Sequence, residues 1–202
     1  MLIEIMKVVT LLSGGLDSSL LAYLLNEEKH DQFPVFINYG QRNFEREWEA
    51  CKFICGRLNL RAPELFDLKG YGKSIPSGLT SDSLDIIKDA FLPNRNALFL
   101  LSASAFAYQN NCTHIAIGFL NEENHIFPDQ TRNFLDKMEE LFYISLGTKI
   151  YILSPFIRFN KADIIALAQR KEVTNTYSCH AGYEKPCGKC IACLEFINSK
   201  KM

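Results

Sequence analysis

The sequence predicts an α/β protein with a doubly wound, mainly parallel sheet and a C-terminal four-cysteine zinc knuckle. Short apolar runs, several of them β-branched, alternate with segments in which apolar residues recur every three or four positions. A glycine pair, Gly14-Gly15, joins the first run to the first such segment, and four cysteines cluster near the C-terminus. Strands that are separated by helices imply a parallel sheet with both faces covered.

The strand and helix patterns alternate from residue 7 to residue 170. The apolar run from Lys7 to Leu12 predicts a buried strand, and the leucines along residues 16–28 predict a helix. Residues 70–90 and 119–130 predict irregular connections, and a polar tail follows the last helix. Further strands are expected at 33–37, 114–118 and 149–153, and further helices at 44–58, 96–109, 134–145 and 161–170.

The loops that carry function are expected at one edge of this sheet. In open parallel sheets, ligands bind beyond the carboxyl ends of the strands. The candidate site is therefore predicted where four loops should meet, at residues 13–18, 38–42, 92–96 and 118–132.

Composition places the chain among globular proteins of one domain, expected here over residues 1–202. Of its residues, 48% are hydrophobic and 22% are charged. The formal net charge of −1 argues against a nucleic-acid-binding protein, which needs many uncompensated Lys and Arg side chains, and favours a small metabolite as partner. The N-terminus lacks the pattern of a secretion signal, and no apolar run reaches the roughly 20 residues that cross a bilayer. We therefore expect a cytoplasmic protein without a membrane partner.

The first strand is followed by the loop Ser13-Gly14-Gly15-Leu16-Asp17-Ser18, inside which a helix begins. A helix N-terminus exposes unpaired N–H groups, and glycines let an anion approach them. The two serines add hydroxyl donors, whereas Asp17 suits a magnesium-linked or helix-capping role. The loop is neither a Walker loop nor the dinucleotide G-x-G-x-x-G pattern. A plain turn is the alternative, but the flanking strand and helix favour a phosphate site.

The tail over residues 176–196 is predicted to bind zinc. Four thiolates form a closed tetrahedral set, and such a site is structural because no position is left for water. Disulfides are the alternative, but an odd total of seven cysteines and a reducing compartment favour the metal. His180 adjoins the first ligand, and whether it contacts the metal is open. The ligands are expected to be Cys179, Cys187, Cys190 and Cys193, spaced C-x7-C-x2-C-x2-C.

Five segments occur in the order seen in a known family. The loop at 13–18 matches the SGGxDS loop of the ATP pyrophosphatase superfamily. Together with this loop and the four-cysteine tail, three further segments resemble the 7-cyano-7-deazaguanine synthase family: "NYGQR" at 38–42, "LPNRN" at 92–96 and "KADI" at 161–164. The resemblance runs from about residue 7 to residue 196 and implies an adenine nucleotide alpha hydrolase-like fold.

The resemblance implies an ATP-dependent ligase of queuosine-type biosynthesis. Such an enzyme adenylates the carboxylate of 7-carboxy-7-deazaguanine, and ammonia then displaces AMP to give an amide. A second activation dehydrates the amide to 7-cyano-7-deazaguanine, so that ATP ends as AMP with pyrophosphate or as an ADP-type product with phosphate. The implied cofactors are Mg²⁺ and structural Zn²⁺, with ATP as a substrate. The site then needs a charge clamp and a positioned acceptor more than a nucleophile.

The same resemblance assigns roles to individual residues. Asp17, Arg95 and Lys161 would be catalytic: Asp17 would place magnesium, Arg95 would neutralise phosphate or carboxylate charge, and Lys161 would reach the phosphates or the leaving pyrophosphate. Surface salt bridges for the arginines and an exposed first-turn position for Lys161 are the alternatives. The ATP-binding set would be Ser13, Gly14, Gly15, Leu16, Asp17, Ser18 and Arg42.

The segment 118–132, "GFLNEENHIFPDQTR", departs from the family pattern. The family usually closes this stretch with Tyr-Pro-Asp-Cys-Arg, whereas this chain has Phe127 in place of the tyrosine and its arginine, Arg132, comes later. A purine-like base needs an acidic or amide partner for its N–H edge and an aromatic face for stacking. Glu123, Phe127, Asp129 and Arg132 are the candidate substrate residues, and a solvated acidic loop is the alternative.

Two other functions stay open at this point. A same-family enzyme could adenylate a different carboxylate or a protein acceptor. A zinc-containing binding module without catalysis is the second alternative, although the intact SGGxDS loop and the lack of positive charge weigh against it. An exposed Phe91 or Phe106 could serve a homodimer.

Overall fold

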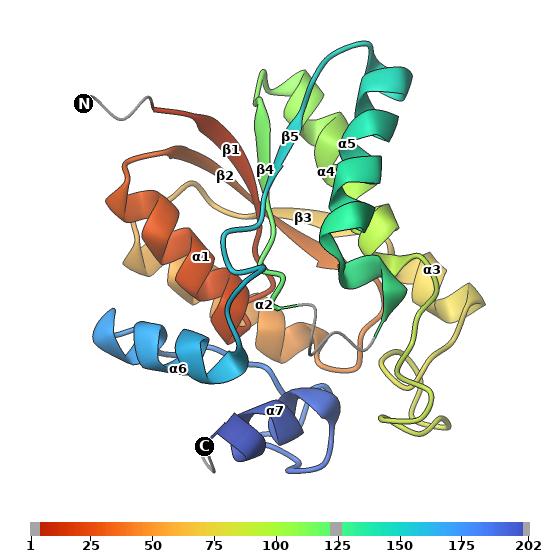
Figure 1. The fold of residues 1–202 in the computed structure, drawn as a ribbon. Helices are drawn as coiled ribbons and strands as arrows, with labels where there is room; N and C mark the ends of the chain where they lie inside the picture. Colours follow the sequence, from red (N-terminus) through yellow and green to blue (C-terminus); the bar gives the residue numbers. More distant parts are fainter. Residues whose placement is uncertain (1–4, 122–126, 200–202) are drawn as a thin grey trace.

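Five parallel strands form the centre of the computed structural model, which describes residues 5–121 and 127–199. Across the sheet their order is β3-β2-β1-β4-β5, so the chain winds outward from β1 in one direction and from β4 in the other (Figure 1). This order confirms the predicted doubly wound, parallel sheet and creates a switch point between β1 and β4. The strands are β1 (Lys7–Leu11), β2 (Asp31–Asn38), β3 (Glu64–Asp67), β4 (His114–Ala116) and β5 (Tyr151–Leu153).

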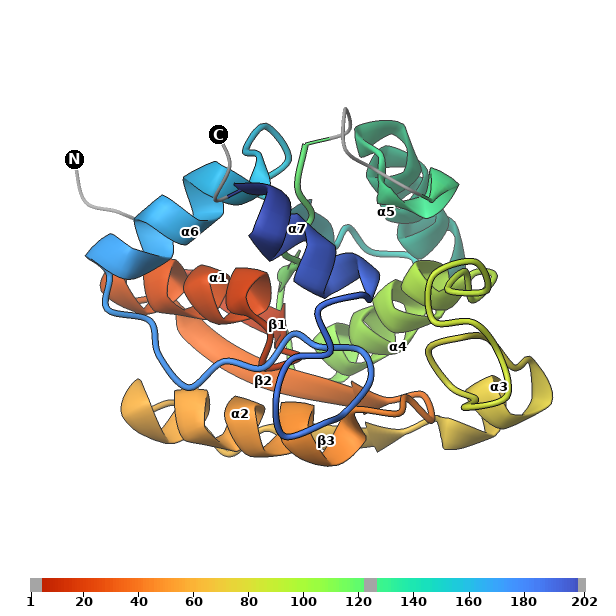
Figure 2. The ribbon, with the colours of Figure 1, turned by 90° about the horizontal axis from the view of Figure 1, so that it is seen from below.

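Helices cover both faces of the sheet (Figures 1 and 2). One face carries α1 (Leu16–Glu27), α2 (Phe44–Arg57) and α6 (Lys161–Arg170). The other face carries α4 (Arg95–Gln109) and α5 (Arg132–Leu146). Three short elements lie toward the carboxyl ends of the strands: α3 (Lys69–Ser74), the 3-10 turn η2 (Pro128–Gln130) and α7 (Ile191–Ser199).

Strand β1 shows why the sheet is buried on both sides. Its side chains alternate between the faces, so Val9 packs in the cluster of α4 and α5, whereas Val8 packs in the cluster of α1 and α6. Both valines are fully buried. A continuous apolar run, rather than an alternating one, is therefore what this central strand requires.

Three elements were missed by the sequence patterns: β3, α3 and α7. Strand β3 is a four-residue edge strand whose side chains are mostly exposed, so it has no apolar run to mark it. Helix α3 occupies the start of the segment that was expected to be irregular, and two of its six residues are glycines. Helix α7 begins inside the tail that was expected to be polar, and it carries Cys193 on its first turn.

Among the helices of the described residues, none is both long and apolar enough to cross a membrane.

Candidate active site

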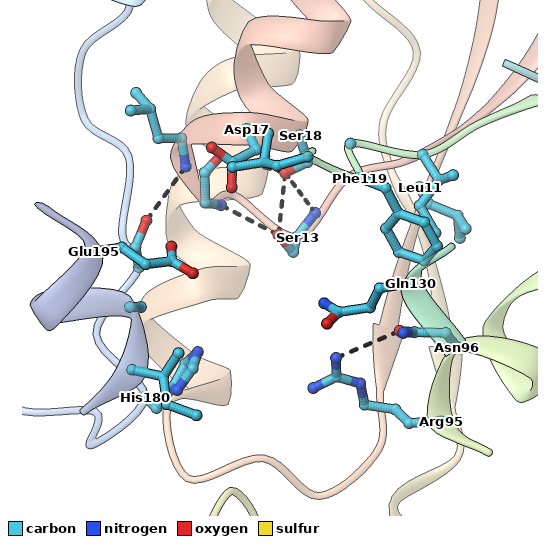
Figure 3. A pocket seen from close by; sticks show the side chains of 18 of the residues that line it. Leu11, Ser13, Asp17, Ser18, Arg95, Asn96, Phe119, Gln130, His180 and Glu195 are labelled. Carbon is cyan, nitrogen blue, oxygen red and sulfur yellow. Dashed lines mark hydrogen bonds between the residues drawn. The ribbon is translucent and has the colours of Figure 1, made fainter. Parts of the chain in front are cut away.

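The carboxyl ends of β1, β2 and β4 open into a cavity of about 510 Å³. Its wall includes the loop after β1, the first turns of α4 and α6, and one side of α7 (Figure 3). The cavity thus lies where parallel-sheet proteins bind ligands, and the predicted loops at 13–18, 38–42 and 92–96 do meet there. Residues of the segment 118–132 also line it, namely Gly118, Phe119, Leu120, Asn121, Phe127 and Gln130.

The loop after β1 is held in shape by its own serines. The Oγ of Ser18 accepts a hydrogen bond from the N–H of Ser13 at 3.2 Å and lies 3.0 Å from the Oγ of Ser13, which itself accepts from the N–H of Gly15 at 3.3 Å. No side chain caps α1, whose N-cap residue is Gly15. Among the first N–H groups of α1, that of Leu16 donates to the Oγ of Ser178 at 3.3 Å, whereas those of Asp17 and Ser18 have no side-chain cap, as an anion site requires.

Gly14 is required by the packing of this loop against α2. Its φ of +77° is in the left-handed region, and a Cβ at this position would lie 2.5 Å from the carbonyl oxygen of Glu47. Gly118, after β4, approaches the other side of α1, where a Cβ would lie 3.2 Å from the backbone nitrogen of Ser18. The two glycines let the loop at 13–18 sit tightly between α2 and β4.

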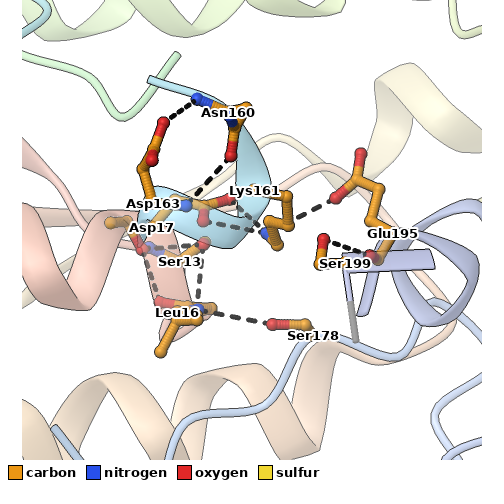
Figure 4. A network of polar contacts seen from close by, with 11 residues as sticks. Ser13, Leu16, Asp17, Asn160, Lys161, Asp163, Ser178, Glu195 and Ser199 are labelled. Carbon is orange, nitrogen blue, oxygen red and sulfur yellow. Dashed lines mark hydrogen bonds and ion pairs between the residues drawn. The ribbon is translucent and has the colours of Figure 1, made fainter. Parts of the chain in front are cut away.

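The tail that carries the cysteines also supports this loop. The N–H of Tyr177 donates to the carbonyl of Gly14 at 2.9 Å, and the N–H of Leu16 donates to the Oγ of Ser178 at 3.3 Å (Figure 4). Tyr177 and Ser178 directly precede Cys179 in the chain. The position of the loop is therefore linked to the structure of the cysteine segment.

Lys161 bridges the phosphate loop and α7. Its Nζ lies 2.8 and 2.9 Å from the carboxylate oxygens of Asp17 and 3.4 Å from Oε2 of Glu195 (Figure 4). Burial lowers the pKa of Lys161, but the two carboxylates outweigh this effect and the net shift is upward. Burial raises the pKa of Glu195, with partial opposition from Lys161. A lysine with a 10% exposed side chain thus remains charged at the cavity wall.

A capping box fixes the base of Lys161. The side chain of Asn160 accepts from the N–H of Asp163 at 3.0 Å, and the carboxylate of Asp163 accepts from the N–H of Asn160 at 2.9 Å. These reciprocal bonds start α6 at Lys161, so the lysine is the first helical residue. Asn160 also lines the cavity.

Arg95 marks the opposite side of the cavity from Lys161. Asn94 adopts a left-handed conformation with a φ of +56°, which turns the chain sharply into α4 and places Arg95 at its first position. The guanidinium lies 5.8 Å from the ring centroids of Tyr39 and of Phe99, and it donates to Oδ1 of Asn96 at 3.4 Å (Figure 3). This arrangement is suited to a planar anion or an aromatic ring.

Glu47 is an acidic wall residue that the motifs did not identify. Its Oε2 accepts a hydrogen bond from the amide of Gln41 at 3.3 Å. Burial raises the pKa of Glu47 to about 7, although the amides of Gln41 and Asn43 and the charge of Arg95 oppose the shift. A signal was present, because Glu47 stands one helical turn before the buried Cys51, on the apolar side of α2.

His180 and Gln130 also face the cavity without having been assigned to it (Figure 3). Burial lowers the pKa of His180 to about 4, and the charges of Arg95 and Lys161 add to this effect. The imidazole is therefore neutral, and its buried Nδ1 has no hydrogen-bond partner. Gln130 stands where the family pattern has a cysteine, and its amide is a polar group next to Phe127.

Several predicted site residues do not line the cavity. Arg42 donates to the carbonyl of Gly78 at 3.3 Å and forms an ion pair with Asp82 in the following connection. The carboxylate of Asp129 accepts from the N–H of Asn96 at 3.3 Å, at the start of α4. Arg132 forms an ion pair with Asp136 on α5 at 2.9 Å. Phe127 does line the cavity, and Glu123 lies outside the described residues.

The four tail cysteines come together as a group. Their sulfur atoms lie within 4.8 Å of one another, and those of Cys187 and Cys193 are 3.9 Å apart. Four sulfurs at about 2.3 Å from a central zinc would be about 3.8 Å apart, so the donor set fits such a metal. Gly188, with a φ of +71°, makes the turn between ligands. His180 is not in this group, because its side chain lines the cavity.

Comparisons with known proteins agree on one family. The family model described as "Queuosine biosynthesis protein QueC" matches residues 7–198. A 7-cyano-7-deazaguanine synthase of Campylobacter jejuni is 34% identical over 204 residues, which cover 93% of this chain and 90% of the relative. One from Nitratiruptor is 35% identical over 202 residues, with the same coverage.

Solved structures share the fold at low sequence identity. A predicted subunit of tRNA methyltransferase from Methanocaldococcus jannaschii aligns with a TM-score of 0.57 and 18% identity, covering 82% of this chain and 75% of that one. An NMN synthetase from Francisella tularensis aligns with a TM-score of 0.54 and 14% identity, covering 89% and 68%. A U34-tRNA thiolase from Methanococcus maripaludis, solved with its [4Fe-4S] cluster, aligns with a TM-score of 0.51 and 16% identity, covering 97% of this chain and 65% of that one.

Proposed function

The chain belongs to the QueC family of queuosine biosynthesis proteins, and from this premise we propose that it converts 7-carboxy-7-deazaguanine, ATP and ammonia into 7-cyano-7-deazaguanine. The observation that carries the proposal is one cavity with two differently equipped sides. One side has the first turn of α1 and Lys161, and the other has Arg95 over the rings of Tyr39 and Phe99. The first suits a triphosphate, and the second suits a planar carboxylate.

The first step would join the substrate carboxylate to the α-phosphorus of ATP. A carboxylate oxygen attacks phosphorus, and the bond to the β-phosphate oxygen breaks, so that pyrophosphate leaves with the electron pair. The N–H groups of Asp17 and Ser18 and the ammonium of Lys161 would hold the departing pyrophosphate. Asp17 would hold Mg²⁺, which neutralises phosphate charge when bound. Arg95 orients the carboxylate for attack.

The amide would form when ammonia attacks the acyl carbon and AMP leaves. A second activation of the amide oxygen by ATP, followed by loss of that oxygen, would give the nitrile. Both activations need the same pyrophosphate or phosphate clamp, so a single cavity can serve them in turn. The gain comes from positioning and charge stabilisation, because the wall offers no nucleophilic thiol among the described residues.

The four-cysteine cluster would hold a structural Zn²⁺ through Cys179, Cys187, Cys190 and Cys193. The all-sulfur donor set and the short sulfur separations support zinc, and a closed set leaves no position for substrate. Elemental analysis should find about one zinc per chain and no absorption near 400 nm. An iron–sulfur cluster, as in the thiolase that shares the fold, would show iron and that absorption instead.

A turnover assay tests the function directly. The purified protein is incubated with Mg-ATP, an ammonium salt and 7-carboxy-7-deazaguanine, and the products are separated by mass spectrometry. We expect the amide and then the nitrile, with AMP and pyrophosphate released in the first activation. No product with a fully metallated protein would contradict the proposal, and AMP release only with another carboxylate would favour the same-family enzyme with a different acceptor.

A further inference from the structure

We propose that Glu47 takes the proton from ammonium in the amide-forming half of the reaction, an inference that rests on the proposed function. Ammonium has no lone pair and cannot attack an acyl carbon until it loses a proton. The cavity must therefore contain a proton acceptor as well as the clamp for the nucleotide. The described wall offers three carboxyl groups for this role, those of Asp17, Glu47 and Glu195.

Two of these three carboxyl groups are already committed to a lysine. Asp17 holds Lys161 at 2.8 Å and Glu195 holds it at 3.4 Å, so neither is free to receive a proton without breaking an ion pair. Glu47 forms no ion pair with any described residue, and the hydrogen-bonding side chains beside its carboxylate are the neutral amides of Gln41 and Asn43. Among the described wall residues, Glu47 is thus the one carboxylate that is not neutralised by direct contact.

Glu47 also stands next to the place where the acyl group is activated. The carbonyl oxygen of Glu47 packs against Gly14, so tightly that a Cβ there would be only 2.5 Å away. The turn of α2 that carries Glu47 therefore directly supports the phosphate loop, and its side chain lines the same cavity as Ser13 and Asp17. An ammonium held by Glu47 would lie beside the acyl adenylate.

The surroundings of Glu47 favour neither its charged nor its neutral form strongly at neutral pH. Arg95 on α4 favours the carboxylate, whereas Tyr39 after β2 and Cys51 on α2 are neutral groups that share its buried environment. Burial raises the pKa of Glu47 to about 7, which matches the pH at which a proton acceptor works best. Gln41 and Asn43 are neutral donors, so the charge of the Glu47 carboxylate is left for ammonium.

The proposed step balances in atoms and charge. One proton passes from ammonium to the carboxylate of Glu47, and the nitrogen lone pair then forms the C–N bond to the acyl carbon. The C–O bond to AMP breaks, and its electron pair leaves on the phosphate oxygen of AMP. The nitrogen loses a second proton to water, and Glu47 later releases its own proton to water. The products are the amide, AMP and two protons.

The test separates adenylation from amide formation in the Glu47→Gln variant of the full chain. Adenylation is followed as substrate-dependent exchange of labelled pyrophosphate into ATP, without ammonia. Amide formation is followed as kcat/KM for total ammonium from pH 6 to pH 8. We expect exchange within about threefold of wild type, and a loss of about 100-fold or more in kcat/KM for ammonium at pH 7.

The pH profile provides a readout that a purely structural role would not change. Without a proton acceptor, the variant depends on free ammonia, whose fraction rises about tenfold per pH unit in this range. Its kcat/KM should rise with that slope, whereas the wild-type profile should level off above pH 7. Glu49→Gln, which removes an exposed carboxylate from the same helix, should leave both reactions unchanged.

Two results would overturn the inference. In the first, Glu47→Gln loses exchange and amide formation in equal proportion, so that the residue serves adenylation or the fold. In the second, the variant keeps its kcat/KM for ammonium. Failure of the wild-type protein to catalyse substrate-dependent exchange would instead overturn the proposed function, so the two failures are distinguishable.

Discussion

The ammonium of Lys161 and the carboxylate of Asp17 form a two-point contact, with Nζ 2.8 and 2.9 Å from the two carboxylate oxygens. Lys161 is the first residue of α6 and Asp17 is the second residue of α1, so the pair joins two helix N-termini that are 144 positions apart in the chain. Both helix ends have positive dipoles directed at the same part of the cavity. The pair therefore keeps a cation at the place where phosphate charge is expected, with Asp17 as its partner until nucleotide binds.

Replacing Lys161 with Met should disable the pyrophosphate clamp. Methionine keeps the length of the side chain but removes the charge, so we expect pyrophosphate exchange to fall by about 100-fold to 1,000-fold. Asp17 and Glu195 would then face each other without a cation, and the free energy of unfolding should fall by about 2 kcal/mol. Exchange kinetics and urea unfolding measure the two effects.

Lys171→Met is the matched control for this variant. Lys171 also pairs with a glutamate, Glu27 at 2.6 Å, but the pair is on the surface, where the side chains are 32% and 48% exposed. We expect the free energy of unfolding to fall by less than about 0.5 kcal/mol and the rate of pyrophosphate exchange to stay unchanged. Equal behaviour of the two lysine variants would show that Lys161 is a structural residue only.

Gly14→Ala should destabilise the protein more than an ordinary glycine substitution. The new Cβ would meet the carbonyl of Glu47 at 2.5 Å, in a residue whose φ is +77°. Backbone strain of about 1 kcal/mol and an overpacking cost of about 1–3 kcal/mol should both apply. Gly147→Ala shares the positive φ, +71°, but has open space around it and should show the strain alone. Similar unfolding free energies for the two variants would mean that α2 yields to the methyl group.

Loss of the metal should weaken ATP binding although the cysteines do not line the cavity. The link is the segment before Cys179, where Tyr177 and Ser178 make hydrogen bonds to the phosphate loop at 2.9 and 3.3 Å. Two hydrogen bonds of about 1 kcal/mol each correspond to a loss of roughly 30-fold in affinity. Titration calorimetry with a non-hydrolysable ATP analogue measures this loss in Cys190→Ser, with Cys112→Ala as a variant of a buried cysteine outside the cluster. An unchanged affinity for the ATP analogue in a metal-free protein would mean that the cysteine cluster does not support the nucleotide site.

The sequence predicted the parts of the molecule that depend on local pattern. The loop at 13–18 was placed at the cavity correctly because glycines, serines and an acid between a strand and a helix form a local chemical unit. The cysteine cluster was identified because its four ligands lie within 15 residues, Cys179 to Cys193. Arg95 and Lys161 were found through the family resemblance, and both line the cavity.

The residues that the sequence missed or misplaced depend on contacts between distant segments. Arg42 was expected at the phosphates, but the connection at 75–90 folds back and engages it through Gly78 and Asp82. Glu47 and His180 lie at the cavity because α2 and the cysteine segment pack against the loop at 13–18. The spacing along α2 places Glu47 on the apolar side of that helix but does not say which segment it will meet. Strand β3 was missed because an edge strand needs few buried side chains.

Glu47 should make the stability of the protein depend on pH. Its pKa is about 7 in the folded protein, against an ordinary value of 4.5, so between these pH values the folded state binds more protons than the unfolded state. The contribution of Glu47 to stability is therefore full below pH 4.5 and is lost as the pH rises toward 7. The free energy of unfolding of Glu47→Gln minus that of wild type should therefore be larger at pH 8 than at pH 5.

Urea unfolding at the two pH values measures this difference, and Glu49→Gln serves as the reference. Any loss of metal at pH 5 affects all three proteins alike and cancels in the comparison. The same pH dependence in wild type and in Glu47→Gln would mean that Glu47 is solvated in the folded protein. This measurement concerns folding alone and does not depend on the identity of the substrate.

Arg95→Lys should reveal whether the guanidinium orients a carboxylate. Lysine keeps the charge but loses the planar fork, and it cannot lie in the same way over the rings of Tyr39 and Phe99, whose centroids are each 5.8 Å from the guanidinium carbon. We expect kcat/KM for the carboxylate substrate to fall by about 10-fold to 100-fold, with a smaller change in KM for ATP. Arg57→Lys, at the exposed end of α2, makes the same substitution away from the cavity and should be neutral. A larger effect on ATP than on the carboxylate would place Arg95 at the nucleotide, and the two sides of the cavity would then exchange their assigned ligands.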